Sequence, residues 1–148
     1  MRGVSSVVGT VLLVGVVVIG ATALFAVAPA APEPPPTARL SLSADAGTDR
    51  VALTHEGGDT LAVEQLNVTV RVDGEPVAHQ PPVPFFAATG FESGPTGPFN
   101  SAHGGRWRAG TTGAFRLAST NTQLDPRDRV SVTVRMGAGV VARLETTA

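Results

Sequence analysis

One short stretch gathers the side-chain types that metal sites and acid–base catalysis use. His55, Glu56 and Asp59 bring one imidazole and two carboxylates within five positions. Their spacing differs from the helical His-Glu-x-x-His zinc motif, and it lacks the regular alternation of oxygen ligands in a calcium loop. Gly57 and Gly58 can instead supply the positive φ angles of a tight reversal between strands. We therefore expect a turn here, with a metal or catalytic site as the alternative.

The other groups that could do chemistry are scattered along the chain. The histidines His55, His79 and His103 are expected in different turns, and no serine lies in a nucleophile elbow. No glycine-rich loop stands between a strand and a helix to hold a phosphate. Cysteine is absent, which excludes disulfides and thiolate ligands or nucleophiles. We predict no enzyme, no metal and no cofactor, because an enzyme would need His55, Glu56 and Asp59 to converge with His79 or His103.

The element that must position everything after it is a hydrophobic helix over residues 4–27. This stretch reads VSSVVGTVLLVGVVVIGATALFAV and contains no charged residue. A membrane hydrocarbon core about 30 Å thick needs roughly 20 apolar residues, so the helix is long enough to span it. It is longer than the roughly 7 to 15 apolar residues of a secretory signal peptide. Cleavage after Ala28 would also leave Pro29 first, so we expect a retained anchor or another processing route.

The residues around the start of this helix suggest that route. Residues 2–9, RGVSSVVG, run straight into the helix and resemble the leader of archaeal type IV pilins and pilin-like proteins. The resemblance implies that a prepilin peptidase cuts on the cytoplasmic side, with Arg2 and Gly3 ending the leader and Val4 beginning the mature chain. Bacterial type IV pilins usually carry glutamate at the fifth mature position, where this chain has Val8. Archaeal members commonly lack that glutamate.

Composition limits the classes of partner that we expect and suggests the kind of organism that makes the protein. The formal net charge is -1 and the sequence pI is about 6.3, so no basic field favours nucleic acid. All the basic residues are arginine, and alanine, glycine, valine and proline are frequent, which is consistent with a GC-rich genome such as that of a halophilic archaeon. The turn at residues 55–59 is similar to a recurrent feature of haloarchaeal pilin-like ectodomains. The charge balance, however, is not strongly acidic, as many halophile surfaces are.

A proline-rich segment separates the helix from the rest of the chain. Residues 28–36 read APAAPEPPP, a composition that favours extended polyproline II at about 3.1 Å per residue. The segment is either a semi-rigid stalk that sets a fixed distance or a generic linker. The predicted domains are therefore a leader over residues 1–3, the helix over 4–27, this linker, and an extracytoplasmic β-domain over 37–148.

The last of these regions has the pattern of short strands. Apolar and polar residues alternate most cleanly over residues 66–72 and 129–136, which places one face of each strand inward. Asp73-Gly74 predicts a type I′ hairpin. The other strand-like runs are 38–43, 50–54, 61–63, 75–78, 113–118 and 140–145. About seven short strands with regular turns predict an antiparallel β-sandwich, and no helix is indicated after the anchor.

Residues 80–112 differ from the strands in having little periodicity. They hold four of the six phenylalanines and the only tryptophan, together with many prolines and glycines. Either Phe85 and Phe86 fill the core while the rest crosses the surface, or the loop is a contact surface for neighbouring subunits or a ligand. Tryptophan and arginine are enriched in binding hot spots. The predicted contact residues are Phe91, Phe99, Arg106, Trp107 and Arg108.

The strand at residues 66–72 also carries a modification signal. Asn67-Val68-Thr69 matches the N-glycosylation sequon. Alternation along the strand places Asn67 on the polar, exposed face, as an acceptor requires. We therefore treat Asn67 as a candidate glycosylation site.

Residues and resemblance together predict a structural subunit of a type IV pilus-like surface filament, involved in assembly, adhesion or surface contact. The helix would be stored in the membrane, freed by leader cleavage and packed against identical helices, with the β-domain outside the cell. Small residues that would allow close packing are Ser5, Gly9, Gly15, Gly20 and Ala21. The expected partners are the membrane, the prepilin peptidase and other pilin subunits. The alternative is a monomeric, membrane-anchored binding module that uses the loop over residues 80–112.

Overall fold

The structure, a computed structural model, describes residues 30–148. The predicted leader and hydrophobic helix lie outside these residues. Within them, Pro35 to Ala148 form one compact unit, and residues 30–37 have no regular secondary structure. None of the helices in this part of the chain has the length and apolar character needed to cross a membrane.

The described residues form an all-β domain in which every pair of neighbouring strands is antiparallel. The strands are β1 (Ala38–Asp45), β2 (Arg50–Gly58), β3 (Leu61–Ala62), β4 (Leu66–Val72), β5 (Glu75–Pro76), β6 (Arg106–Trp107), β7 (Thr112–Arg116), β8 (Arg129–Met136) and β9 (Gly139–Thr147). Three single 3₁₀ turns, η1 (Val63–Gln65), η2 (Gly97–Phe99) and η3 (Ser101–His103), interrupt the connections. The prediction of an all-β domain with antiparallel sheets is confirmed. The 3₁₀ turns were not predicted.

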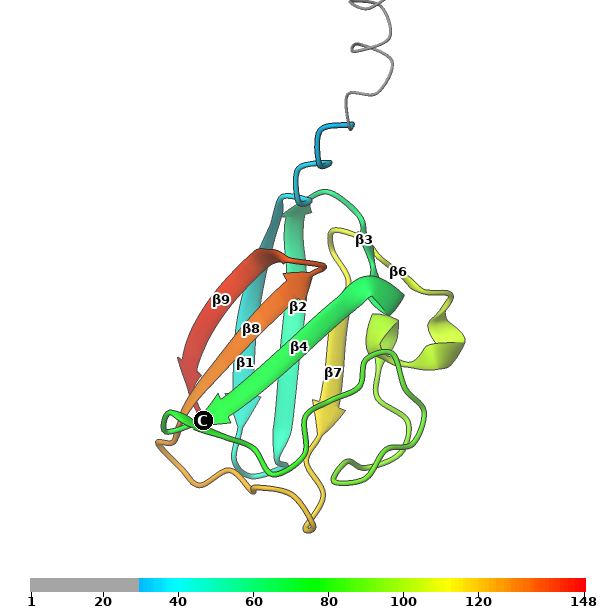
Figure 1. Ribbon diagram of the computed structural model, residues 1–148. Coiled ribbons are helices and arrows are strands. Elements are labelled where there is room, and N and C mark those ends of the chain that lie inside the picture. Colours follow the sequence, from blue (N-terminus) through cyan, green and yellow to red (C-terminus); the bar gives the residue numbers. More distant parts are fainter. Residues whose placement is uncertain (1–29) are drawn as a thin grey trace, which may run out of the picture. The chain divides into compact units, whose positions relative to one another are not determined.

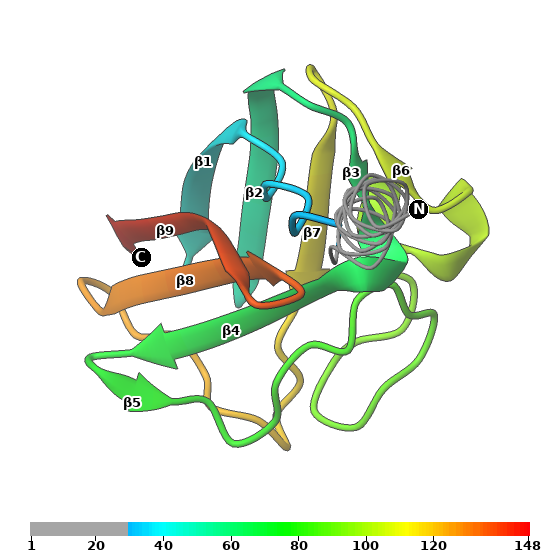
Figure 2. The same cartoon turned by 45° about the horizontal axis from the view of Figure 1, so that its top comes forward.

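Two larger sheets make the body of the domain. One has the strand order β1-β2-β7 and the other β5-β4-β8-β9, while β3 and β6 form a separate pair. The larger sheets lie over each other as two layers, and their strands cross at an angle (Figure 1). The turned view shows β9 next to β1 on the left side, and the β3–β6 pair on the right (Figure 2).

The two strands with the cleanest alternation behave as the sequence predicts. β4 and β8 pair along their whole length, from Leu66 opposite Met136 to Val72 opposite Val130. Their valines at alternate positions are buried against the other layer, as period-two patterning requires. Asp73 and Gly74 after β4 have φ angles of 50° and 85°, the two positive values of the predicted type I′ turn.

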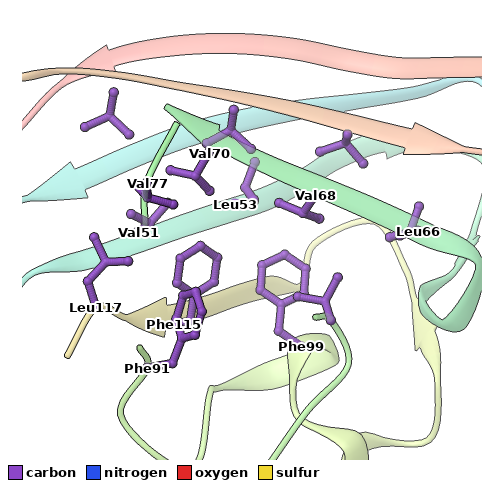
Figure 3. Close-up of a cluster of buried hydrophobic side chains, with 14 of the residues drawn as sticks. Val51, Leu53, Leu66, Val68, Val70, Val77, Phe91, Phe99, Phe115 and Leu117 are labelled. Atoms are coloured by element: carbon purple, nitrogen blue, oxygen red, sulfur yellow. The ribbon is translucent and has the colours of Figure 1, made fainter. Parts of the chain in front are cut away.

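The core lies between the layers. Val68 and Val70 of β4 face Val51 and Leu53 of β2, and a group of phenylalanines continues the core beside them (Figure 3). The aromatic rings contact one another, and Phe91 packs edge-on against Phe115 with ring centroids 5.4 Å apart. Such aromatic contacts add to the stabilisation that area burial alone provides.

The segment over residues 80–112 is built into this core. The backbone of Phe85 bonds to that of Phe99 at 2.9 Å, and Thr96 pairs with Ala114 of β7. Phe85 is buried, whereas the Phe86 side chain is 61% exposed. The expectation that both phenylalanines fill the core is therefore right for Phe85 and wrong for Phe86, because neighbouring residues in extended backbone point to opposite sides.

Candidate functional site

The imidazole of His55 is held in the core beside Trp107. His55 lies on β2 rather than in a turn, which corrects the sequence prediction, since the strand continues to Gly58. Its ring is fully buried and stands edge-on to the Trp107 ring, with centroids 5.9 Å apart. Nε2 donates to the carbonyl oxygen of Asp59 at 2.7 Å, so the ring carries its proton there and Nδ1 has no partner.

The two carboxylates of this stretch do not converge on the imidazole. The Asp59 carboxylate accepts a hydrogen bond from the Thr37 N–H at 2.9 Å, and the Asp59 N–H donates to the Thr37 carbonyl at 2.8 Å. Glu56 follows His55 on the strand and is exposed on the opposite face. Across residues 30–148, no three histidine, cysteine, aspartate or glutamate side chains are grouped to hold a metal ion. The residues at 55–59 thus tie the start of the domain to the end of β2.

The predicted contact surface is corrected at its three aromatic residues. Phe91, Phe99 and Trp107 are 6%, 0% and 0% exposed, so none of them can serve as a surface anchor. Trp107 is covered because β6 pairs with β3, which sets it opposite Leu61, and its indole N–H donates to the Thr111 carbonyl at 2.8 Å.

The two arginines beside Trp107 remain at the surface. Arg106 precedes Trp107 on β6, and Arg108 directly follows the strand. Both are exposed, because successive residues of extended backbone point to opposite sides. Arg106 lines a hollow of about 330 Å³ together with Glu64, Gly104 and the strand β3. These arginines are the part of the predicted contact set that is available to a partner.

A second hollow, which was not predicted, is lined by two arginines. Arg50 on β2 lies directly opposite Arg116 on β7. Both line a hollow of about 310 Å³, which residues 92–96 close on the other side. Arg116 forms an ion pair with Glu92, with 3.7 Å between Nη1 and Oε2. The pairing of β2 with β7 brings together residues far apart in the sequence, and no local pattern predicts that register.

The sequon residue Asn67 is exposed, as its alternating position predicts. It lies on β4 opposite Arg135 of β8. The Thr69 hydroxyl donates to the Asn67 side-chain oxygen at 3.3 Å, so the two residues that define the sequon stand on the same face of the sheet.

The residues predicted for leader processing, Arg2, Gly3 and Val4, lie outside the described residues. Their role in processing stays a prediction. Residues 2–42 match the family described as archaeal type IV pilin, N-terminal. The match therefore runs from Arg2 into strand β1.

A second comparison concerns a curated relative. The chain is 36% identical to an uncharacterized protein of Archaeoglobus fulgidus over 74 residues, which is 47% of this chain and 52% of that protein. The chain spans about half the length of the curated relative that it matches.

The N-terminal region of this chain is therefore similar to that of archaeal type IV pilins, and the predicted resemblance is confirmed. In this chain the hydrophobic N-terminal stretch precedes a β-domain. Archaeal type IV pilins are a structural family without enzymatic activity.

Proposed function

We propose that the chain is a structural subunit of a type IV pilus-like surface filament. A prepilin peptidase removes residues 1–3, and the helix over residues 4–27 then packs with its copies in the filament core. The β-domain lies outside the cell on the filament surface, where it makes contacts with neighbouring subunits or other surfaces. The membrane holds the subunit before assembly.

The observation that carries this proposal is the match of residues 2–42 to the pilin N-terminal region. It includes the basic residue, the glycine and the whole uncharged stretch that the filament core requires. Packing the helix against identical helices keeps the same apolar area away from water as the lipid does, and glycines and alanines permit close approach.

The β-domain supports the proposal through the way it is joined to the preceding segment. Thr37 is bonded twice to Asp59 directly after the proline-rich residues. Pro35 also packs at the β8–β9 turn, where a Cβ on Gly139 would come within 2.8 Å of the Pro35 Cβ. The folded domain therefore begins at Pro35, within the last residues of the proline-rich segment.

The alternative, a monomeric anchored binding module, depended on the aromatic residues of the loop over residues 80–112. Burial of Phe91, Phe99 and Trp107 removes those anchors. Arg106 and Arg108 alone give no reason to prefer a monomer, so the filament subunit is the better supported function.

The exposed sequon leads us to propose N-glycosylation at Asn67 as a second feature of the same surface. The glycan would stand on the outer face of β4, away from the core. It would cover part of the face that a filament presents to its surroundings.

The experiment that tests the filament proposal compares two variants in the native cells. Gly3→Val places a branched side chain at the predicted cleavage site, and Arg2→Lys is the matched control because it keeps the charge of the leader. Labelling of the β-domain in electron micrographs should mark filaments for the unchanged chain and for Arg2→Lys, and only the cell membrane for Gly3→Val. Labelled filaments with an uncleaved Gly3→Val chain would contradict the proposal.

A further inference from the structure

Two arginine side chains lie side by side on the outer face of the three-stranded sheet. Arg50 and Arg116 are directly opposite in the β2–β7 register, so their side chains leave the sheet on the same side. The next pair, Val51 and Phe115, points into the core. Like charges directly opposite each other destabilise a sheet, so the carboxylates around this pair decide how far it is compensated.

The carboxylates near the two guanidinium groups leave them only partly compensated. The Glu92 carboxylate lies 3.7 Å from the Arg116 guanidinium. The Glu92 side chain is 57% exposed and the Arg116 side chain is 50% exposed, so water screens this ion pair. Asp45 is opposite Arg50 on β1, but its Oδ1 accepts from the Gly47 N–H at 2.7 Å. Within residues 30–148, no ion pair joins Arg50 to a carboxylate. The two carboxylates balance the two arginines in formal charge, but the Arg50 guanidinium has no ion-pair partner in this part of the chain and is available to an anionic ligand.

The hollow beside the arginines has the size and the groups of a small binding site. Its volume of about 310 Å³ is at the lower end of the range for ligand sites, roughly 300–1,000 Å³. The nearly buried Ala114 and Pro95 line it, together with the exposed Ser93 and Thr96. The groups present are thus two guanidiniums, hydroxyls and a small apolar floor.

Residues 92–96 are fixed against β7, so the hollow does not need to be ordered by a ligand. The Glu92 N–H donates to the Arg116 carbonyl at 3.0 Å, and Gly94 donates to the Phe86 carbonyl at 2.7 Å. Thr96 and Ala114 exchange two backbone hydrogen bonds, at 2.8 and 3.2 Å. A site held in its binding geometry loses less entropy when a ligand binds.

We propose that this hollow binds a carboxylate carried on a hydroxylated ring, as in the uronic acid units of an acidic polysaccharide. Arg50 and Arg116 bind the carboxylate, because planar guanidiniums match its two oxygens. Ser93 and Thr96 bond to ring hydroxyls, and the apolar face of the ring packs on Ala114 and Pro95. This inference does not depend on filament assembly, since all of its residues belong to one domain.

The test is calorimetric titration of the full chain in detergent with a tetrasaccharide of glucuronic acid. Arg50→Gln and Arg116→Gln should each weaken binding about tenfold or more, as expected for loss of a hydrogen bond to a charged group. Arg143→Gln is the matched control, because Arg143 is an exposed strand arginine on β9. Trp107 fluorescence checks that every variant is folded.

A second set of measurements separates this site from general charge attraction. Glu92→Gln should tighten binding, because it removes the carboxylate that competes for Arg116. A glucose tetrasaccharide and inorganic sulfate should bind at least tenfold more weakly than the glucuronic acid tetrasaccharide.

Three results would overturn the inference. One is equal weakening by Arg143→Gln, and another is sulfate binding as tight as that of the acidic tetrasaccharide. The third is absence of saccharide binding together with loss of self-association in Arg50→Gln and Arg116→Gln, which would mean that the carboxylates come from a second copy of the chain.

Discussion

Asp59 and Thr37 bind each other twice, through backbone atoms at 2.8 Å and through the Asp59 carboxylate at 2.9 Å. The pair joins the residue before β1 to the residue after β2. It is located where the proline-rich segment ends and the folded domain begins. His55 supports the same place from inside, since its ring donates to the Asp59 carbonyl. A group of residues suited to chemistry by type is thus used to fix the start of the domain.

Removal of the Asp59 carboxylate should loosen this junction. We expect Asp59→Ala to lower the free energy of unfolding by about 1–2 kcal/mol, because the Thr37 N–H loses a charged acceptor. Urea unfolding followed by Trp107 fluorescence measures the change, since Trp107 is the only tryptophan and is fully buried. Glu56→Ala is the control and should stay within about 0.5 kcal/mol. Equal effects of the two substitutions would contradict the assigned role.

The two glycines beside this junction should differ in their tolerance of a side chain. Gly58 has a φ of 101°, and an added Cβ would collide with the Thr37 carbonyl oxygen. Gly57 has no positive φ, and its Cβ would meet only the flexible Arg39 side chain, at 3.2 Å from Nη2. We expect Gly58→Ala to cost at least about 1–3 kcal/mol of stability and Gly57→Ala to cost clearly less. Thermal unfolding of both variants decides this, and the reverse order would contradict the close contact between Gly58 and Thr37.

Trp107 should matter for stability rather than for surface contact. Trp107→Ala empties a fully buried site and should lower the free energy of unfolding by about 3–5 kcal/mol. Arg108→Ala should change it by no more than about 0.5 kcal/mol, since the side chain is exposed. Circular dichroism during urea unfolding provides the measurement without tryptophan. A Trp107→Ala chain of unchanged stability would restore the contact surface first predicted for this residue.

Glycosylation at Asn67 is tested by mass. The native chain should be heavier than its sequence by a glycan, and both Asn67→Gln and Thr69→Ala should remove that excess. Thr69→Ser keeps the sequon and should retain it, which makes it the matched control. Excess mass that persists in Asn67→Gln would place the modification elsewhere.

The strands with clean alternation and the hairpin turn after β4 could be predicted well. β4 and β8 show alternation because one face of each meets the core, and Asp73-Gly74 has the residue types that two positive φ angles require. Each of these features depends on residues that are close together in the sequence, so a sequence pattern is enough to find them.

The candidate site could not be found in this way. Trp107 is buried because β6 pairs with β3, and Arg50 meets Arg116 because β2 pairs with β7. Each of these pairs joins segments separated by a long stretch of chain, and the residues between them have no regular period. The many aromatic residues of the segment over 80–112 indicated that it matters to the domain. They did not indicate whether these side chains point into the core or to the surface, since core and contact residues share the same side-chain types.

The central claim, processing as a pilin, is tested most directly by the mass and first residue of the protein isolated from native membranes and cell-surface fractions. We predict a mature chain that begins at Val4, with the hydrophobic stretch of residues 4–27 retained. A chain in both fractions that still begins at Met1 or Arg2 would contradict the account.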